Sequence, residues 1–135
     1  MYLLDENITK DQRELLERWR FRVKQIGVDF KTKGIKDEQI ITLLQQLNGI
    51  LFLTRDNDFF KKEYCHSKYC IVYLDVEKFE VAYFIRNFLK HSDFNSTKKR
   101  LGKIIKINQT LIQYYILNSD ELFTIRNSFQ HNLKE

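Results

Sequence analysis

Short apolar runs alternate along the chain with longer segments in which apolar residues recur every three or four positions. Four short runs have the length of buried strands: residues 2–4, 28–30, 50–53 and 71–74. Three longer segments have helical spacing: residues 7–27, 37–47 and 77–90. Strands that alternate with helices in this way predict a mainly parallel sheet joined by right-handed crossovers.

Glycine and aspartate mark the expected helix ends. Gly27 and Gly49 follow the first two helical segments as C-terminal caps, and Asp37 precedes the second as an N-cap. Beyond the third helix the pattern changes to two β-rich runs, 103–108 and 111–117, which predict a hairpin. The tail, 120–135, has weak periodicity, so a short helix and a frayed end both remain open.

The length and composition are those of one folded domain, residues 1–135. Hydrophobic residues make up 43% of the chain and charged residues 30%, which is typical of a folded protein. The N-terminus lacks the layout of a signal peptide, and no apolar run reaches the roughly 18 residues of a membrane span. We therefore expect a cytoplasmic protein that does not associate with membranes.

Acidic residues stand directly after two of the expected strands. Asp5 and Glu6 follow the first strand, Asp56 and Asp58 follow the third, and Asp37 opens the helix that leads into the third. The carboxyl ends of parallel strands meet at one edge of a sheet, where ligands bind at the switch in strand order. The pattern therefore predicts a cluster of Asp5, Asp37, Asp56 and Asp58, with Glu6 as a candidate fifth member.

Such a cluster needs a counter-charge, because unpaired carboxylates repel and raise one another's pKa. Mg²⁺ and Mn²⁺ bind oxygen ligands, which suits a site without His or Cys, and such ions activate water for phosphodiester hydrolysis. The alternative is local: Asp37 is an N-cap, and Asp56 and Asp58 shape a turn.

Two other groups of residues carry weaker signals. Cys65, His66 and Cys70 resemble part of a zinc motif, but no fourth ligand is nearby, so two free thiols are expected. The net charge of +5 equals that of one acid-free segment, 94–119, which contains Lys98, Lys99, Arg100, Lys103 and Lys106. This segment suits either a polyanion-binding surface or the protection of a sheet edge.

Three motifs, in order and spacing, resemble the compact PIN-like ribonuclease family, which is related to the VapC toxins. They are "LLDEN" at 3–7, "GIKDEQII" at 34–41 and "NGILFLTRDNDF" at 48–59. The resemblance covers about the first 75 residues, and the later hairpin also fits. Larger PIN domains have a further late acid, for which Asp75 and Asp93 are candidates without a convincing motif.

The resemblance implies a PIN-like three-layer α/β/α fold with a mainly parallel central sheet and a C-terminal β-hairpin. It also implies Mg²⁺- or Mn²⁺-dependent cleavage of RNA by the toxin of a bacterial toxin–antitoxin pair. The matched acids, with catalytic and metal-binding roles, are Asp5, Asp37, Asp56 and Asp58. Four basic residues beside them in sequence are expected to bind substrate phosphates: Lys36, Arg55, Lys61 and Lys62. An antitoxin protein is then an expected partner, and a homodimer is left open.

Two functions of other classes remain. A phosphoacceptor receiver domain also places paired acids after its first strand and an Asp after its third, but this chain lacks the receiver's later Lys-Pro step. A non-catalytic nucleic-acid or protein-binding module would use the basic segment together with Tyr114, Tyr115 and Phe123.

Overall fold

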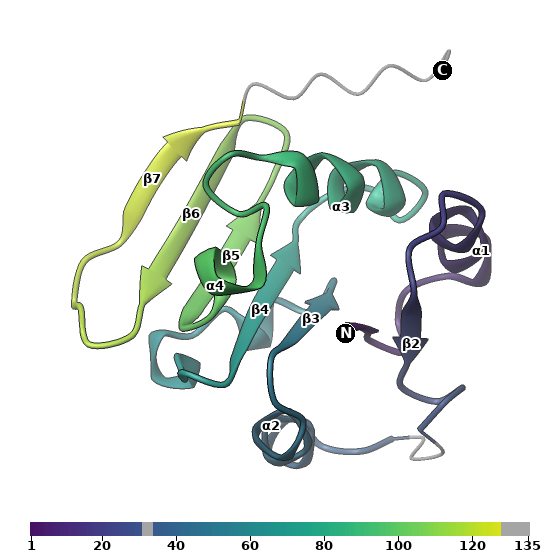
Figure 1. Cartoon of the computed structure of the whole chain (residues 1–135), viewed down its shortest axis with the longest axis horizontal. Helices are drawn as coiled ribbons and strands as arrows, with labels where there is room; N and C mark the ends of the chain where they lie inside the picture. The colour runs from purple at the N-terminus through teal and green to yellow at the C-terminus, as the bar shows by residue number, and fades with distance from the viewer. Residues whose placement is uncertain (31–33, 128–135) are drawn as a thin grey trace.

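The computed structural model describes residues 1–30 and 34–127, which form an α/β fold around one mixed sheet (Figure 1). Its seven strands lie in the order β2-β1-β3-β4-β5-β6-β7. Their bounds are Tyr2–Leu4 (β1), Val23–Gln25 (β2), Ile50–Thr54 (β3), Tyr69–Leu74 (β4), Lys103–Ile107 (β5), Leu111–Ile116 (β6) and Phe123–Arg126 (β7). The pairs from β2 to β5 are parallel, whereas β6 and β7 are antiparallel to their neighbours.

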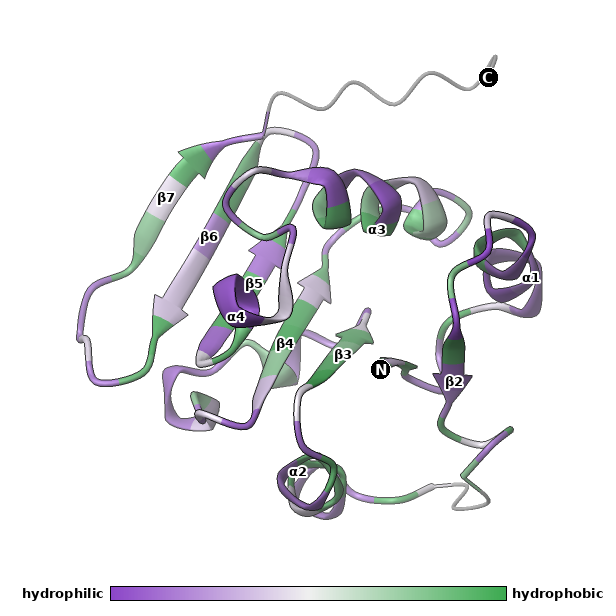
Figure 2. Ribbon diagram, viewed as in Figure 1, coloured by the Kyte–Doolittle hydropathy of each residue, from purple (hydrophilic) through white to green (hydrophobic). Residues whose placement is uncertain are grey.

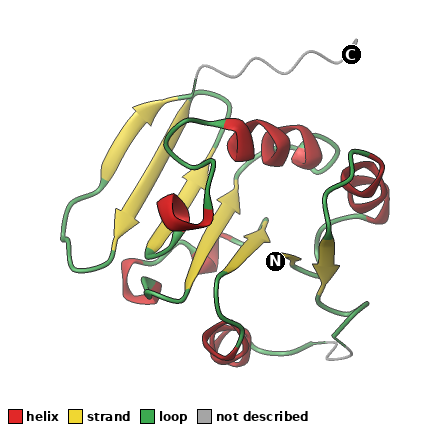
Figure 3. Ribbon diagram, in the orientation of Figure 1, coloured by secondary structure: helices red, strands yellow, loops and turns green. Residues whose placement is uncertain are grey.

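Helices lie on both faces of the sheet. The α-helices are α1 (Lys10–Arg18), α2 (Asp37–Gln46), α3 (Val81–Lys90) and α4 (Thr97–Arg100). Two single 3₁₀ turns follow β3: η1 (Asn57–Phe59) and η2 (Lys62–Tyr64). Helices α1 and α3 lie on one side of the sheet and α2 on the other (Figures 1 and 3). This arrangement is compatible with the expected three-layer α/β/α architecture.

Alternating side chains of the central strands divide the core in two. Leu51 and Leu53 of β3 pack with α1 and α3, while Ile50 and Phe52 pack with α2 and η1. Every residue of β3 is buried, as expected for a parallel strand covered on both faces. Helix α3 correspondingly turns its hydrophobic side toward the sheet (Figure 2).

The predicted helix over residues 7–27 is wrong beyond Arg18. Arg20 adopts a positive φ of 70°, which ends the helix, and the chain then forms β2. β2 pairs with β1 along its whole length and so satisfies backbone groups that β1 would otherwise leave unpaired. Gly27 is therefore not a helix cap: it lies in the turn after β2, with φ at 86°.

Two further expected elements differ from the structure. Residues 28–30 are not a strand: only an isolated bridge joins Ile26 to Phe30, and Val28 is 54% exposed. The third helix begins at Val81, four residues later than predicted, so Phe79 lies in the preceding loop and is 57% exposed. Phe79 lies at helical spacing from Tyr83, so the sequence pattern alone predicts it on the same helix face.

The C-terminal half combines a confirmed hairpin with an additional strand. β5 and β6 are antiparallel, as predicted, but β5 is also a fifth parallel strand beside β4. Within the tail, Phe123–Arg126 forms β7, so the helical alternative is wrong there, and residues 128–135 lie outside the described part of the chain. Since β5 lies inside the sheet, its lysines do not protect a sheet edge.

Among the residues that the structure describes, none of the helices combines the length and apolar character needed to cross a membrane.

Candidate metal centre

The turn after β3 presents two carboxylates at the carboxyl edge of the parallel strands. Asp56 precedes η1 as its N-cap, and its Oδ1 accepts a hydrogen bond of 2.9 Å from the Asp58 backbone N–H. The alternative that these acids shape the turn is therefore confirmed for Asp56. The side chain of Asp58 is exposed and makes no such local bond.

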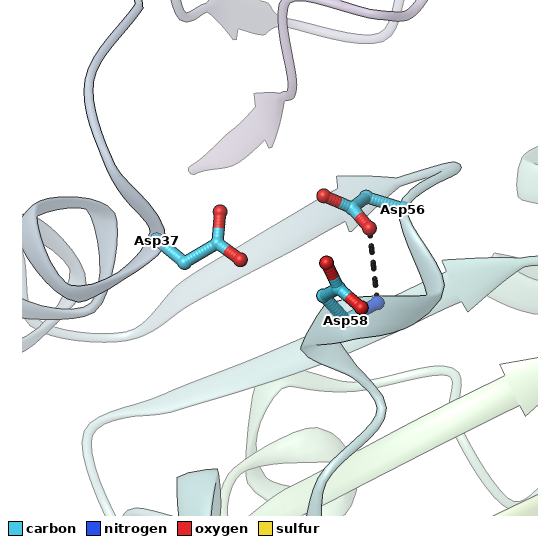
Figure 4. A group of neighbouring side chains, drawn as sticks. All are labelled: Asp37, Asp56 and Asp58. Atoms are coloured by element: carbon cyan, nitrogen blue, oxygen red, sulfur yellow. Dashed lines mark hydrogen bonds between the residues drawn. The ribbon is translucent and has the colours of Figure 1, made fainter.

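Helix α2 brings a third carboxylate to the same place. Asp37, Asp56 and Asp58 each offer an oxygen within 4.8 Å of those of the other two, and the three carboxylates face a common space (Figure 4). The predicted N-cap role of Asp37 is wrong: Lys36 is the cap residue, and its backbone N–H bonds the Gln39 side chain. We refer to Asp37, Asp56 and Asp58 as the acid group.

Asp5 lies at this edge but is not a member of the acid group. It follows β1, is 5% exposed, and accepts hydrogen bonds from the Thr54 hydroxyl at 2.6 Å and from the Glu6 N–H at 2.8 Å. The same Thr54 hydroxyl accepts from the Asp56 backbone N–H at 3.0 Å. The buried Thr54 hydroxyl thus connects Asp5 to the backbone of Asp56. Through these two hydrogen bonds Asp5 helps to position the acid group. Glu6 is exposed.

The electrostatics of the edge favour a bound cation. The pKa of the Asp37 carboxyl is raised by partial burial and then by repulsion from Asp56 and Asp58, while Lys61 opposes this shift. The pKa of Asp5 is also raised, chiefly by burial, and Asp56 adds a smaller repulsion. None of the three carboxylates of the acid group forms an ion pair within the described residues.

These residues fit a hard divalent cation. Three carboxylates converge from two elements without a nearby His or Cys, and oxygen-only donor sets of this kind suit Mg²⁺ or Mn²⁺. The pKa of Asp37 is raised first by burial and then by repulsion from Asp56 and Asp58, and this second cause is expected where their negative charge is left uncompensated.

The four predicted substrate-binding cations occupy different surroundings. Lys61 is exposed and close enough to Asp37 to lower its pKa, and Lys36 is exposed next to Asp37. Lys62 instead pairs with Asp120 of the β6–β7 connection, away from the acid group. Arg55 extends toward the loop after β4, where its Nη2 donates to the Val76 carbonyl at 3.2 Å.

A cavity of about 560 Å³ opens at this same edge beside Arg55. It is lined by the loop after β4, from Asp75 to Glu77, and by the β5–β6 turn at 108–110. Asp75, the candidate late acid, is exposed here and interacts with the Tyr73 hydroxyl, whose pKa is raised by burial and by that carboxylate. It is not part of the acid group.

The other chemical candidates lie elsewhere. Both cysteines are free, and the Cys70 thiol is fully buried, which raises its pKa to about 12. Arg100 is buried and donates to the Phe94 carbonyl at 2.9 Å, while Lys103 donates to the Lys99 carbonyl at 2.6 Å. Most of the basic segment thus lies around α4 and the start of β5, opposite the carboxyl edge, and only Lys106 is further along the strand, over Tyr73.

Sequence reasoning missed two polar residues that build this edge. Thr54 follows the predicted strand at 50–53 and was given no role, although its place directly before Arg55 and Asp56 was an available signal. Gln25 fell inside the wrongly predicted helix. Its buried amide donates to the carbonyls of Asp5 and Ile8 at 3.0 and 2.8 Å and so fixes the turn after β1.

Comparison with known proteins found no matching family model, no matching curated protein and no matching solved structure.

Proposed function

We propose that this protein is a Mg²⁺- or Mn²⁺-dependent endoribonuclease of PIN-like type. The observation that carries the proposal is the acid group, three mutually repelling carboxylates without a described cation partner at the carboxyl edge of the parallel strands. Two of its members follow β3, which borders β1 where the strand order changes direction, and open α/β sheets bind ligands at such points. The motif resemblance supports the choice of RNA as substrate.

The residues of the edge have separable roles. Asp37, Asp56 and Asp58 would hold the cation. When bound, such a cation activates water and stabilises charge on the oxygens of a phosphodiester. Asp5 positions Asp56 through the Thr54 hydroxyl and does not itself belong to the acid group. Lys61 and Lys36 supply positive charge for substrate phosphate, whereas Lys62 is engaged by Asp120.

The biological setting that fits this activity is a bacterial toxin–antitoxin pair in the cytoplasm. In that setting RNA is the substrate and a protein antitoxin is the partner that restrains it. The proposal of an antitoxin, like that of a homodimer, rests on the family resemblance alone. Co-purification of the chain with the product of a neighbouring small reading frame would test it.

A receiver-like phosphoacceptor domain is the second candidate. The order of the five parallel strands is that of flavodoxin-like folds, which include receivers, and Asp56 follows β3 as a phosphoacceptor would. Against it, β5 ends at Ile107 and is followed by Asn108, not by the lysine of a receiver. The carboxylate from α2 is also not part of the receiver pattern. Incubation with acetyl phosphate tests this candidate, since a receiver would gain a phosphoryl group on Asp56.

The decisive experiment measures folding, metal binding and cleavage in the parent and in Asp56→Asn. Asparagine keeps the oxygen that caps η1 but removes one charge, so the metal-free variant should be as stable as the parent or slightly more stable. Mn²⁺ at about 100 times its Kd should stabilise the parent by about 2.7 kcal/mol, and the variant should lose this gain together with cleavage of a mixed-sequence RNA.

Asp93→Asn is the matched control, because Asp93 is an exposed aspartate that is not part of the acid group. It should keep both metal-linked stabilisation and cleavage. If Asp56→Asn instead loses about 0.5–1.5 kcal/mol without any metal effect in the parent, Asp56 only fastens the turn and the proposed function is wrong.

A further inference from the structure

The cavity beside Arg55 at the carboxyl edge has walls of mixed charge. Arg55 contributes a guanidinium, while Asp75 and Glu77 contribute carboxylates from the loop after β4. Two acids against one base make this cavity a poor place for a phosphate group. Its volume, about 560 Å³, is within the range of small-molecule sites and is ample for a nucleobase.

The donors of Arg55 are incompletely used. One nitrogen, Nη2, bonds the Val76 carbonyl, whereas Nε is buried without a hydrogen-bond partner among the described residues. The guanidinium forms no ion pair with any described carboxylate. Nη1 donates to no described residue, so this end of the guanidinium remains available to an acceptor on a ligand. The Val76 carbonyl meanwhile holds the side chain at the cavity wall.

The two carboxylates of the cavity are not equivalent. Asp75 interacts with the Tyr73 hydroxyl. Glu77 is exposed and forms no side-chain hydrogen bond or ion pair within the described chain. Glu77 is therefore the available acceptor. On the opposite wall, the turn at 108–110 is held rigid, because the Asn108 side chain accepts from the N–H groups of Thr110 and Leu111.

We propose that this cavity binds a guanine base, with Glu77 as acceptor and Arg55 as donor. Guanine alone among the bases offers two adjacent donors, N1–H and the N2 amino group, for one carboxylate. It also offers two acceptors, O6 and N7, for one guanidinium. Adenine would place its amino group against Arg55. Uracil offers Glu77 a single ring N–H, and cytosine offers only its amino group, because its ring N3 is an acceptor. The inference deepens the proposed ribonuclease, and rests on it, by naming the base that lies beside the scissile phosphodiester.

Binding of nucleoside monophosphates in the presence of EDTA tests the proposal without requiring cleavage. GMP should bind about ten-fold more tightly than AMP or UMP in NMR titrations. IMP, which lacks only the N2 amino group, should fall between GMP and AMP. Equal affinity for all four nucleotides, or no binding of GMP, would overturn the assignment.

Substitutions of Glu77 and Arg55 test which of these side chains distinguishes guanine from the other bases. Glu77→Gln should bring the GMP and IMP affinities together, and Arg55→Lys should weaken GMP about ten-fold because lysine lacks the two-pronged donor. Glu14→Gln is the control, since Glu14 is a surface carboxylate on α1 that does not line the cavity. The exposed position of Glu77 makes a folding defect unexpected in Glu77→Gln, and its melting temperature checks this. An unchanged preference for GMP over IMP in that variant would contradict the role of Glu77.

A comparison of GMP with short single-stranded RNAs that contain one guanine or one adenine tests whether the bound guanine belongs to RNA or to a free nucleotide. Tighter binding of the guanine RNA than of GMP supports a base within RNA. Binding of GMP with no preference between the two RNAs overturns the link to RNA and assigns the cavity to a free guanine nucleotide. A GMP preference without Mn²⁺-dependent cleavage would overturn the proposed nuclease but not the guanine site.

Discussion

The two edges of the parallel strands carry opposite charges, and the two sets of charged groups differ in the partners that they have within the described protein. At the carboxyl edge, the three carboxylates of the acid group lie within 4.8 Å of one another without a described ion-pair partner. At the amino edge, Lys99, Arg100 and Lys103 donate to backbone carbonyls at 2.6–2.9 Å. These three basic groups are bonded to carbonyls of the protein, whereas the acids have no ion-pair partner among the described residues.

This difference shows why the density of charge in a sequence is a poor guide to a binding surface. The five basic residues of the segment 94–119 suggested a path for RNA. Lys99 and Arg100, however, bond carbonyls of the loop that joins α3 to α4, and Lys103 bonds a carbonyl of α4 itself. The acids are fewer and scattered over residues 37–58, yet they converge. Unsatisfied charge, more than total charge, is the feature that supports our proposal of a cation site at the carboxyl edge.

Removing the Thr54 hydroxyl, which connects Asp5 to the backbone of Asp56, should have the largest effect on folding. Thr54→Val leaves the buried Asp5 carboxylate without its 2.6 Å donor and the Asp56 N–H without its acceptor, so we expect a loss of about 1–3 kcal/mol in urea unfolding. Mn²⁺ affinity should fall about 10- to 100-fold, because Asp56 is no longer positioned. Thr54→Ser, which keeps the hydroxyl, should retain most of both, and a fully stable Thr54→Val would contradict the connecting role.

Substitutions at the amino edge should affect folding modestly and RNA not at all. Lys99→Gln combined with Lys103→Gln removes the hydrogen bonds of these lysines to three acceptors, the Ser92 carbonyl, the Asn95 side chain and the Lys99 carbonyl. We expect a loss of about 1 kcal/mol in unfolding free energy. RNA affinity and its dependence on salt should match the parent. A flatter salt dependence would show that this edge also binds the nucleic acid and would remove the contrast between the edges.

The smallest effect concerns the pH dependence of the metal-free protein. The pKa of Asp37 is raised above its usual value of 3.8, so the folded state holds this proton more tightly than the unfolded chain. Its contribution to stability is therefore lost as pH rises from about 3.8 through the raised pKa. In EDTA, the melting temperature of the parent should fall relative to that of Asp37→Asn as the pH rises through this range.

Comparing the two proteins is necessary because the lowered pKa values of Asp11 and Asp120 act in the opposite direction in both. Added Mn²⁺ should reverse the trend in the parent alone. A constant difference in melting temperature across the range would mean that the pKa of Asp37 is not raised in the folded protein.

The elements that the sequence predicted correctly are those with strong local signals. The strands β1 and β3 are short apolar runs bounded by polar residues, and the β5–β6 hairpin has two β-rich runs around a polar turn. β2 was missed because Val23 and Ile26 continue the helical spacing of α1. Its pairing with β1 is a contact between residues about twenty positions apart, which local periodicity does not encode.

The sequence by itself determined which residue types stand at the ends of the strands, and through the parallel crossovers it placed Asp37, Asp56 and Asp58 at one edge. The tertiary structure decided what each acid does there. Asp5 is not in the acid group, because its carboxylate accepts a hydrogen bond from Thr54, which is buried in β3 between β1 and β4. Lys62 is not free to bind substrate phosphate, because it pairs with Asp120 of the β6–β7 connection. Both outcomes depend on partners that are 49 and 58 residues away in the chain, so only the packing of the sheet could select them.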